Sequence, residues 1–118
     1  MQTAIQSPDF VITDALNLFI KDQIRKTMRG PAEHVEKLTI RLKDINGSKG
    51  GKDKECCVEI KLAEQAPVVV IKRNSNAYAS IRSALVRASR TTLRRIQKRR
   101  FNKRHREADK TQSPESKP

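Results

Sequence analysis

The segment Lys37-Leu38-Thr39-Ile40-Arg41-Leu42-Lys43 alternates polar and aliphatic side chains without a break. This period of two places the aliphatic residues on one face of a β-strand and the polar residues on the other. The alternation returns in residues 56–62, and residues 68–71 are β-branched throughout, so both segments are predicted strands. A short extended segment, Gln2–Gln6, ends at Ser7-Pro8-Asp9 and predicts a fourth strand. Strands that bury a single face need a second layer to cover it.

Two amphipathic helices are predicted to provide that layer. The first begins after Thr13, a residue type that caps helix N-termini, and ends at Gly30-Pro31. Its apolar positions are Leu16, Phe19, Ile20, Ile24 and Met28. The second begins at Asn76, and its inward stripe is predicted from helical spacing. This stripe consists of Tyr78, Ile81, Leu85, Ala88, Thr92 and Ile96. The sequence therefore predicts an α+β fold with the order β-α-β-β-β-α, in which two helices pack on one face of a four-stranded sheet.

The second helix is predicted to be longer than the sheet. If it runs from about residue 76 to Lys103 it is about 40 Å long, whereas strands of about eight residues span only about 26 Å. Its last turns, with Arg99, Arg100 and Lys103, should extend beyond the sheet. The final residues are mostly Ser, Pro, Lys, Gln and Glu, which cannot offset the entropy of ordering. We expect one domain over residues 1–103 and a disordered C-terminal tail over residues 104–118.

Positive charge is concentrated in the second half of the chain. The formal net charge of the 118 residues is +13, with 26 Lys and Arg against 13 Asp and Glu. The segment from Gln65 to Arg106 contains 13 of these cations and no acidic residue, so the rest of the chain is close to neutral. Such an excess promotes non-specific association unless a polyanion is the intended partner.

A basic ridge, defined as Arg87, Arg90, Arg94 and Lys98, is predicted on the outer face of the second helix, about half a turn from its inward stripe. A solvated helix face is the alternative, but such faces normally mix both signs of charge. Arg90 and Arg94 are like charges four residues apart, which repel by a few tenths of a kcal/mol. A phosphate-bearing partner would relieve this repulsion, so the ridge favours nucleic acid.

Structured RNA is favoured over DNA as the partner. Arginine outnumbers lysine in this helix, and its planar guanidinium suits bidentate phosphate contacts. The sequence has no zinc finger, leucine zipper or helix-turn-helix pattern, whereas the predicted layers resemble RNA modules that recognise shape. With no Trp, one Tyr and three Phe, stacking on bases is not expected to be the main binding mode.

Other cations are open to two interpretations. Lys21, Arg25 and Arg29 share the outer face of the first helix and could extend the basic surface, but Asp22 dilutes their charge. Lys37, Arg41 and Lys43 on the polar strand face are expected to aid solubility. The Gly- and Lys-rich connection 44–54 fails the nucleotide-binding loop pattern, because position 46 is Asn and position 53 is Asp. We interpret it as a strand connection with a possible secondary RNA contact.

Several function classes have little support in the sequence. No apolar run approaches the roughly 20 residues that span a bilayer, and no signal peptide is evident, so a soluble cytoplasmic protein is expected. The adjacent Cys56 and Cys57 are expected to be reduced thiols. His34 and His105 lie far from further ligands, so no metal or other cofactor is expected. No nucleophile has a base at motif spacing, so the chain is not expected to be an enzyme. A membrane-surface helix is disfavoured because the apolar stripe lacks large side chains.

Two motifs resemble the family of ribosome hibernation-promoting factors and ribosome-associated inhibitors. They are Ile12-Thr13-Asp14-Ala15-Leu16, followed by Phe19-Ile20, and Asn76-Ala77-Tyr78-Ala79-Ser80-Ile81 at the start of the basic helix. With element order and spacing, the resemblance covers about residues 1 to 103. It implies a domain that occupies the small-subunit channel for messenger and transfer RNA and silences translation in stress or stationary phase. The short tail predicts a short form that lacks the dimerisation domain of the long forms.

Carried onto this chain, the resemblance implies that basic residues of both helices contact ribosomal RNA. The predicted RNA-binding residues are Lys21, Arg25, Arg82, Arg87, Arg90, Arg94, Arg95, Lys98 and Arg99. The implied partners are the small ribosomal subunit and its RNA, with no membrane and no small-molecule substrate, and a free monomer is expected. A general RNA- or DNA-binding chaperone with a basic helix is the alternative function. The chain departs from the family at Ser7-Pro8, in the longer connection 44–54 and in its Arg-rich last helix.

Overall fold

The four predicted strands form one mixed sheet in a computed structural model that describes residues 1–9, 11–45 and 53–116, with residues 102–116 as backbone only. The strands are β1 (Gln2–Gln6), β2 (Val35–Asp44), β3 (Lys54–Leu62) and β4 (Val68–Asn74). Their order in the sheet follows the sequence; β1 pairs parallel to β2, and the other neighbours are antiparallel. The predicted strands are therefore confirmed, and β2 is longer than its alternating segment.

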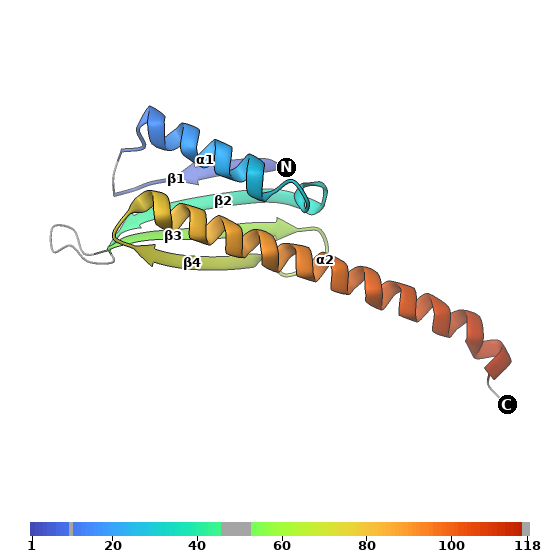
Figure 1. The fold of residues 1–118 in the computed structure, drawn as a ribbon. Helices are drawn as coiled ribbons and strands as arrows, with labels where there is room; N and C mark the ends of the chain where they lie inside the picture. The colour runs from blue at the N-terminus through green and yellow to red at the C-terminus, as the bar shows by residue number, and fades with distance from the viewer. Residues whose placement is uncertain (10, 46–52, 117–118) are drawn as a thin grey trace.

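Two helices, α1 (Asp14–Thr27) and α2 (Ala77–Ser116), cover one face of this sheet (Figure 1). Helix α1 is the crossover that parallel β1 and β2 require. Both predicted caps are present: the Thr13 hydroxyl accepts a hydrogen bond from the Leu16 N–H at 3.1 Å, and the Asn76 side chain accepts one from the Tyr78 N–H at 2.8 Å. The predicted β-α-β-β-β-α fold is confirmed, with a short 3-10 helix, η1 (Ala32–His34), added before β2.

The core lies between the sheet and the helices. The aliphatic residues of β2 and β3 that alternate in the sequence are buried, and they pack against the inner faces of α1 and α2. The adjacent cysteines point to opposite faces: Cys56 is buried in the core and Cys57 is half-buried on the open face. Burial raises the pKa of the Cys56 thiol to about 12. Both cysteines are free, as the sequence predicts.

Two predicted core residues lie at the border of the core, where Phe19 is half-buried and packs against it and Tyr78 is more exposed. Phe19 and Tyr78 pack edge to face against each other, with ring centroids 4.8 Å apart, and Tyr78 is 40% exposed. The pair joins α1 to the first turn of α2. Ser80 and Ala84 are buried instead, and their small side chains let α2 approach the sheet closely.

Helix α2 extends well past the end of the sheet, as its predicted length requires (Figure 1). The sequence predicts that the helix ends near residue 103 and that residues 104–118 are disordered, whereas the helical backbone continues to Ser116. No glycine or proline interrupts the chain between Ala77 and Ser113, so nothing in that segment breaks the backbone hydrogen bonds. A ribosome-binding domain over residues 1–103 stays a prediction.

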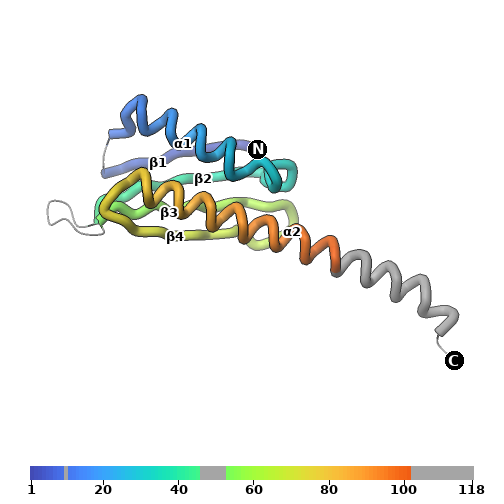
Figure 2. Tube along the Cα trace, viewed as in Figure 1, coloured from blue at the N-terminus to red at the C-terminus, as the bar shows by residue number. Residues whose placement is uncertain are grey.

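The two antiparallel connections of the sheet lie at its opposite ends. Figure 2 shows the β3–β4 turn at the end where α2 leaves the sheet and the β2–β3 connection at the opposite end. Residues 46–52 of that connection, with the predicted secondary RNA contact, lie outside the described residues. Its two ends are tied together, because the Lys54 ammonium lies 2.8 Å from the Asp44 carboxylate.

Candidate nucleic-acid interface

The four residues of the basic ridge lie on the solvent side of α2. Arg87, Arg90, Arg94 and Lys98 are all exposed, whereas residues at the intervening positions that face the sheet are buried. The buried set is Ser80, Ile81, Ala84, Leu85, Ala88, Thr92 and Ile96. Because the buried set holds α2 on the sheet in one rotational orientation, the ridge points away from the domain.

The basic ridge has no intramolecular counter-charge in the described part of the chain. None of its four side chains makes an ion pair or hydrogen bond there. Other surface cations do have acidic partners: Arg73 lies 3.0 Å from Glu55, and Arg41 lies 3.8 Å from Glu59. The ridge is therefore a row of exposed cations that repel one another, which favours a polyanion as its ligand.

Two hollows lie along the basic ridge, and each is lined in part by its side chains. One, of about 430 Å³, is lined by Arg87, Arg90, Leu93, Arg94 and Gln97. The other, of about 380 Å³, is lined by Lys72, Ala79, Arg82, Ser83, Val86, Arg87 and Arg90. Each hollow presents several cationic side chains to one space, as phosphate binding requires.

Lys72 is a cation of this surface that the sequence reasoning missed. It lies on β4 beside the first turns of α2 and lines the second hollow. The sequence pattern could have identified it. Lys72 continues the alternation of Val68 and Val70, so it must lie on the strand face that is turned toward the helices.

Arg82 lies at the border between the ridge and α1. Its side chain is exposed and lines the second hollow, and its guanidinium carbon lies 6.0 Å from the centre of the Phe19 ring. This cation–π contact orients Arg82 without neutralising it.

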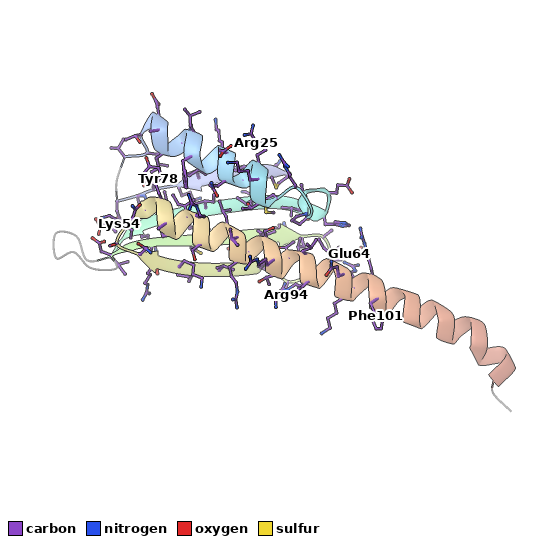
Figure 3. All side chains as sticks on the ribbon, in the orientation of Figure 1. Arg25, Lys54, Glu64, Tyr78, Arg94 and Phe101 are labelled. Atoms are coloured by element: carbon purple, nitrogen blue, oxygen red, sulfur yellow. The ribbon has the colours of Figure 1, made fainter. Side chains whose placement is uncertain are left out.

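Three further arginines of α2, which we call the anchor arginines, contact the rest of the fold. They are Arg95, Arg99 and Arg100. Arg95 donates hydrogen bonds to the Ala66 carbonyl at 2.7 Å and the Pro67 carbonyl at 3.4 Å. Arg99 donates to the Ala63 carbonyl at 3.2 Å and lies 2.8 Å from the Glu64 carboxylate. Figure 3 shows Glu64 beside α2, where the helix leaves the sheet.

The contacts of the anchor arginines differ from what was predicted for the last turns of α2. Arg99 and Arg100 were expected to extend beyond the sheet as a positive end, but Arg100 lies 3.0 Å from the Nε2 atom of His34, the last residue of η1. A cavity of about 350 Å³ lies beside them, and its lining includes Glu33 and Glu36. These carboxylates make the cavity a poor phosphate site. All three anchor arginines thus contact other parts of the fold: Arg95 and Arg99 bind carbonyls of the β3–β4 turn, and Arg100 contacts His34.

The predicted cations of α1 lie apart from the ridge. Phe19 and Thr27 face α2, because Phe19 contacts Tyr78 and the Thr27 carbonyl accepts a hydrogen bond from the Ser89 hydroxyl. Lys21 is two positions after Phe19 and Arg25 two before Thr27, so each is rotated by about 200° from α2.

Arg25 also has an acidic partner. Its guanidinium lies 2.5 Å from the Asp22 carboxylate, and the Lys26 ammonium lies 3.0 Å from the same group. The hydrogen bond from Lys26, aided by the one from Arg25, lowers the pKa of Asp22, so this carboxylate stays ionised at neutral pH.

Comparison with solved structures identifies the fold. The N-terminal domain of Protein Y from Thermus thermophilus matches with a TM-score of 0.63 and 18% identity, covering 80% of this chain and 98% of that domain. A ribosomal subunit interface protein from Coxiella burnetii matches with a TM-score of 0.69 and 12% identity, covering 82% of this chain and 99% of that protein. The chain shares their fold. The resemblance to the hibernation-promoting factors is thus confirmed for the fold.

The sequence itself gives no match of this kind. No protein-family model matches it, and no curated protein is significantly similar to it. In addition, no helix in the described residues is long and apolar enough to cross a membrane.

The structure divides the nine predicted RNA-binding residues into three groups. Five of them share one surface on α2: Arg82, Arg87, Arg90, Arg94 and Lys98. Arg95 and Arg99 are bound to the β3–β4 turn, and Lys21 and Arg25 lie on the far side of α1. The first group, with Lys72, is the candidate interface.

Proposed function

We propose that this chain binds the small ribosomal subunit through the basic ridge, occupies the channel for messenger and transfer RNA, and silences translation during stress or in stationary phase. The observation that carries the proposal is a row of four exposed cations without an intramolecular partner in the described residues, on a helix with a fixed orientation. The similar protein from Coxiella burnetii is a ribosomal subunit interface protein, which supports a ribosomal partner.

The basic ridge suits a folded RNA surface. From Arg87 to Lys98 the helix rises by about 16 Å, so the ridge can contact several phosphates at once. Arginine forks bind phosphate oxygens in pairs, and each neutralised phosphate releases condensed counterions. Affinity should therefore fall steeply as the salt concentration rises.

The rest of the domain positions the ridge and excludes other ligands from the channel. Helix α2 is held by the core along its first half and by the anchor arginines where it leaves the sheet. A domain held in this way blocks a channel by occupying it, with no catalytic step and no cofactor. We propose that it acts in the cytoplasm as a stoichiometric binder, that it is a monomer when free, and that it binds neither a membrane nor a small-molecule substrate.

A footprint on small-subunit RNA tests both which RNA the chain binds and which face of the chain makes the contact. We expect the wild-type chain to protect nucleotides of the decoding channel, to co-sediment with ribosomes at low salt and to inhibit cell-free translation. The variant R90E/R94E should lose all three. The matched control K37E/K43E makes the same change of charge on the open face of the sheet and should retain them. Protection elsewhere, or binding without inhibition of translation, would contradict the proposal.

A general RNA- or DNA-binding chaperone is the second candidate function. It is favoured by the lining of the two hollows, whose lysine and arginine side chains attract any polyanion. Competition separates the two functions. Excess duplex DNA or transfer RNA should displace a general binder from ribosomes, whereas a channel-specific binder should remain bound.

A further inference from the structure

A cavity at the end of the hydrophobic core, which we call the end cavity, lies where α2 leaves the sheet. Its volume is about 350 Å³. Three core side chains contribute to its lining: Val35 of β2, Leu62 of β3 and Ile96 of α2, which are only 3–5% exposed. An apolar group that enters the end cavity would therefore contact the core itself, and its burial there would favour binding.

The end cavity and the basic ridge lie on opposite sides of α2. Arg94 is two positions before Ile96 and Lys98 is two positions after it, so each is rotated by about 200° from the direction of Ile96. An RNA that binds the ridge thus leaves the end cavity open to a second partner.

The charges around the end cavity differ from those of the ridge. Its lining includes Glu33, Glu36, Arg99 and Arg100. Arg99 lies 2.8 Å from the carboxylate of Glu64 (Figure 3), so three carboxylates surround two guanidinium groups here. Glu33 and Glu36 are exposed, and they make no ion pair or hydrogen bond within the described residues. Negative charge is therefore in excess at this cavity, which favours a cationic partner and disfavours RNA.

A β-bulge places one of these carboxylates at the end cavity. The register between β2 and β3 shifts between Val35 and Lys37, so Glu36 has no partner on β3. In a regular strand Val35 and Glu36 would point to opposite faces of the sheet, whereas here both line the same cavity. Bulges of this kind redirect side chains next to functional sites. The backbone itself thus sets a carboxylate beside the apolar lining.

We infer that the end cavity receives one apolar side chain of a cationic segment of a ribosomal protein, whose lysine or arginine residues pair with Glu33 and Glu36. This inference rests on the proposed function and adds to it a protein contact on the side of α2 that faces away from the RNA. A ribosome presents both RNA and protein, so the two sides of α2 bind two components of one particle. The end cavity is at the lower end of the volumes of ligand pockets, so it accommodates a side chain and not a helix or strand.

Removal of the two carboxylates separates this inference from binding to RNA alone. E33Q/E36Q makes the chain more positive, so its affinity for ribosomes would stay the same or rise if RNA were the only partner. We expect the affinity to fall by about 3- to 10-fold, because two ion pairs with the cationic segment are lost. The matched control E55Q/E59Q removes the same charge from the open face of the sheet and should not weaken binding. Unchanged or higher affinity in E33Q/E36Q would overturn the inference.

Filling the end cavity tests the apolar part of the contact. Ala63 is exposed and lines the cavity, whereas Ala66 is exposed on the same β3–β4 turn and is not part of the lining. A63W should weaken ribosome binding by about 10- to 100-fold, the range for burial of one aliphatic side chain. A66W, the matched control, should bind within about threefold of wild type. Urea denaturation compares the stability of the two variants, and wild-type affinity in A63W would contradict insertion of a side chain.

Photo-crosslinking with purified small subunits tests which component reaches each side of α2. The photoreactive residue p-benzoylphenylalanine would replace Ala66, next to Gln65 in the cavity lining, and in a second variant Leu93, which lines a hollow of the ridge. Position 66 should crosslink to a protein, and position 93 should crosslink to RNA. E33Q/E36Q should reduce the protein crosslink. Crosslinks from position 66 to RNA alone, or none, would rule out the protein contact.

Failure of the inference and failure of the proposed function give different results. If R90E/R94E binds ribosomes as well as wild type, the proposed function is wrong, whatever the cavity variants do. If R90E/R94E loses binding while E33Q/E36Q and A63W retain it, the ridge binds RNA and the protein contact at the end cavity is wrong. Circular dichroism of each variant confirms that the helices are intact.

Discussion

Helix α2 carries two sets of arginines that differ in direction more than in chemistry. Arg94 and Arg95 are neighbours in the sequence, yet Arg94 is an exposed residue of the basic ridge, and Arg95 donates hydrogen bonds to two backbone carbonyls. A rotation of about 100° per residue separates their directions. The density of positive charge along a sequence therefore does not define a binding surface, because the orientation of the helix assigns each cation to a role.

The two sets should also have opposite effects on the folded state. The ridge brings like charges within one turn of each other, which costs a few tenths of a kcal/mol per pair. The anchor arginines satisfy carbonyls of the β3–β4 turn and fix α2 where it leaves the core. Binding and stability are thus assigned to different faces of one helix, and substitutions can separate them.

The largest effect is expected from removing the charge of the whole basic ridge. The variant R87Q/R90Q/R94Q/K98Q should bind ribosomes on the order of a thousandfold more weakly, because four charge-assisted contacts are lost. The slope of log affinity against log salt should decrease by about three to four. The free energy of unfolding should stay the same or rise slightly. Sedimentation across a salt series and urea denaturation measure these quantities, and binding within threefold of wild type would rule out the ridge as the interface.

The fold and the ridge could be predicted because each depends on a local period. Alternation in residues 37–43 and 56–62 defined the strands, and a period of 3.6 residues placed Ala88 and Arg90 on different faces of α2. The caps at Thr13 and Asn76 are equally local, since each side chain bonds a backbone group two or three residues away.

The anchor arginines could not be predicted from such periods. The carbonyls that Arg95 and Arg99 bind are 29 and 36 residues away in the sequence. They become neighbours only when α2 docks on the sheet, so the sequence showed only cations. The contact of Phe19 with Tyr78 depends in the same way on how the helices cross.

A smaller effect is expected when the ridge keeps its charge and loses its guanidinium groups. The variant R87K/R90K/R94K should bind ribosomes about tenfold more weakly, because an ammonium group cannot form the paired hydrogen bonds of a guanidinium. The salt dependence should match that of wild type, because the number of cations is unchanged. Unaltered affinity would show that the ridge acts through charge alone, which would favour the general chaperone.

The anchor arginines should give the opposite pattern. We expect R95A/R99A to lower the free energy of unfolding by about 1–2 kcal/mol through lost hydrogen bonds, with ribosome binding within about threefold of wild type. The matched variant R90A/R94A removes the same charge, and it should lose affinity without losing stability. Urea denaturation and sedimentation of the two variants at one salt concentration make the comparison. An equal loss of affinity in both variants would mean that binding depends on the total positive charge of α2 and not on the direction in which its arginines point.

The smallest effect is expected on α1. K21Q/R25Q should weaken ribosome binding by less than about threefold, because Lys21 and Arg25 point away from α2 and Asp22 already offsets Arg25. The matched variant R87Q/R90Q removes the same two charges from the ridge and should weaken binding far more in the same sedimentation assay. A comparable loss in K21Q/R25Q would show that RNA reaches around α1 as well, as the resemblance to the hibernation factors implies. The interface would then be the whole helical layer, and the distinction between faces would apply only to the anchor arginines.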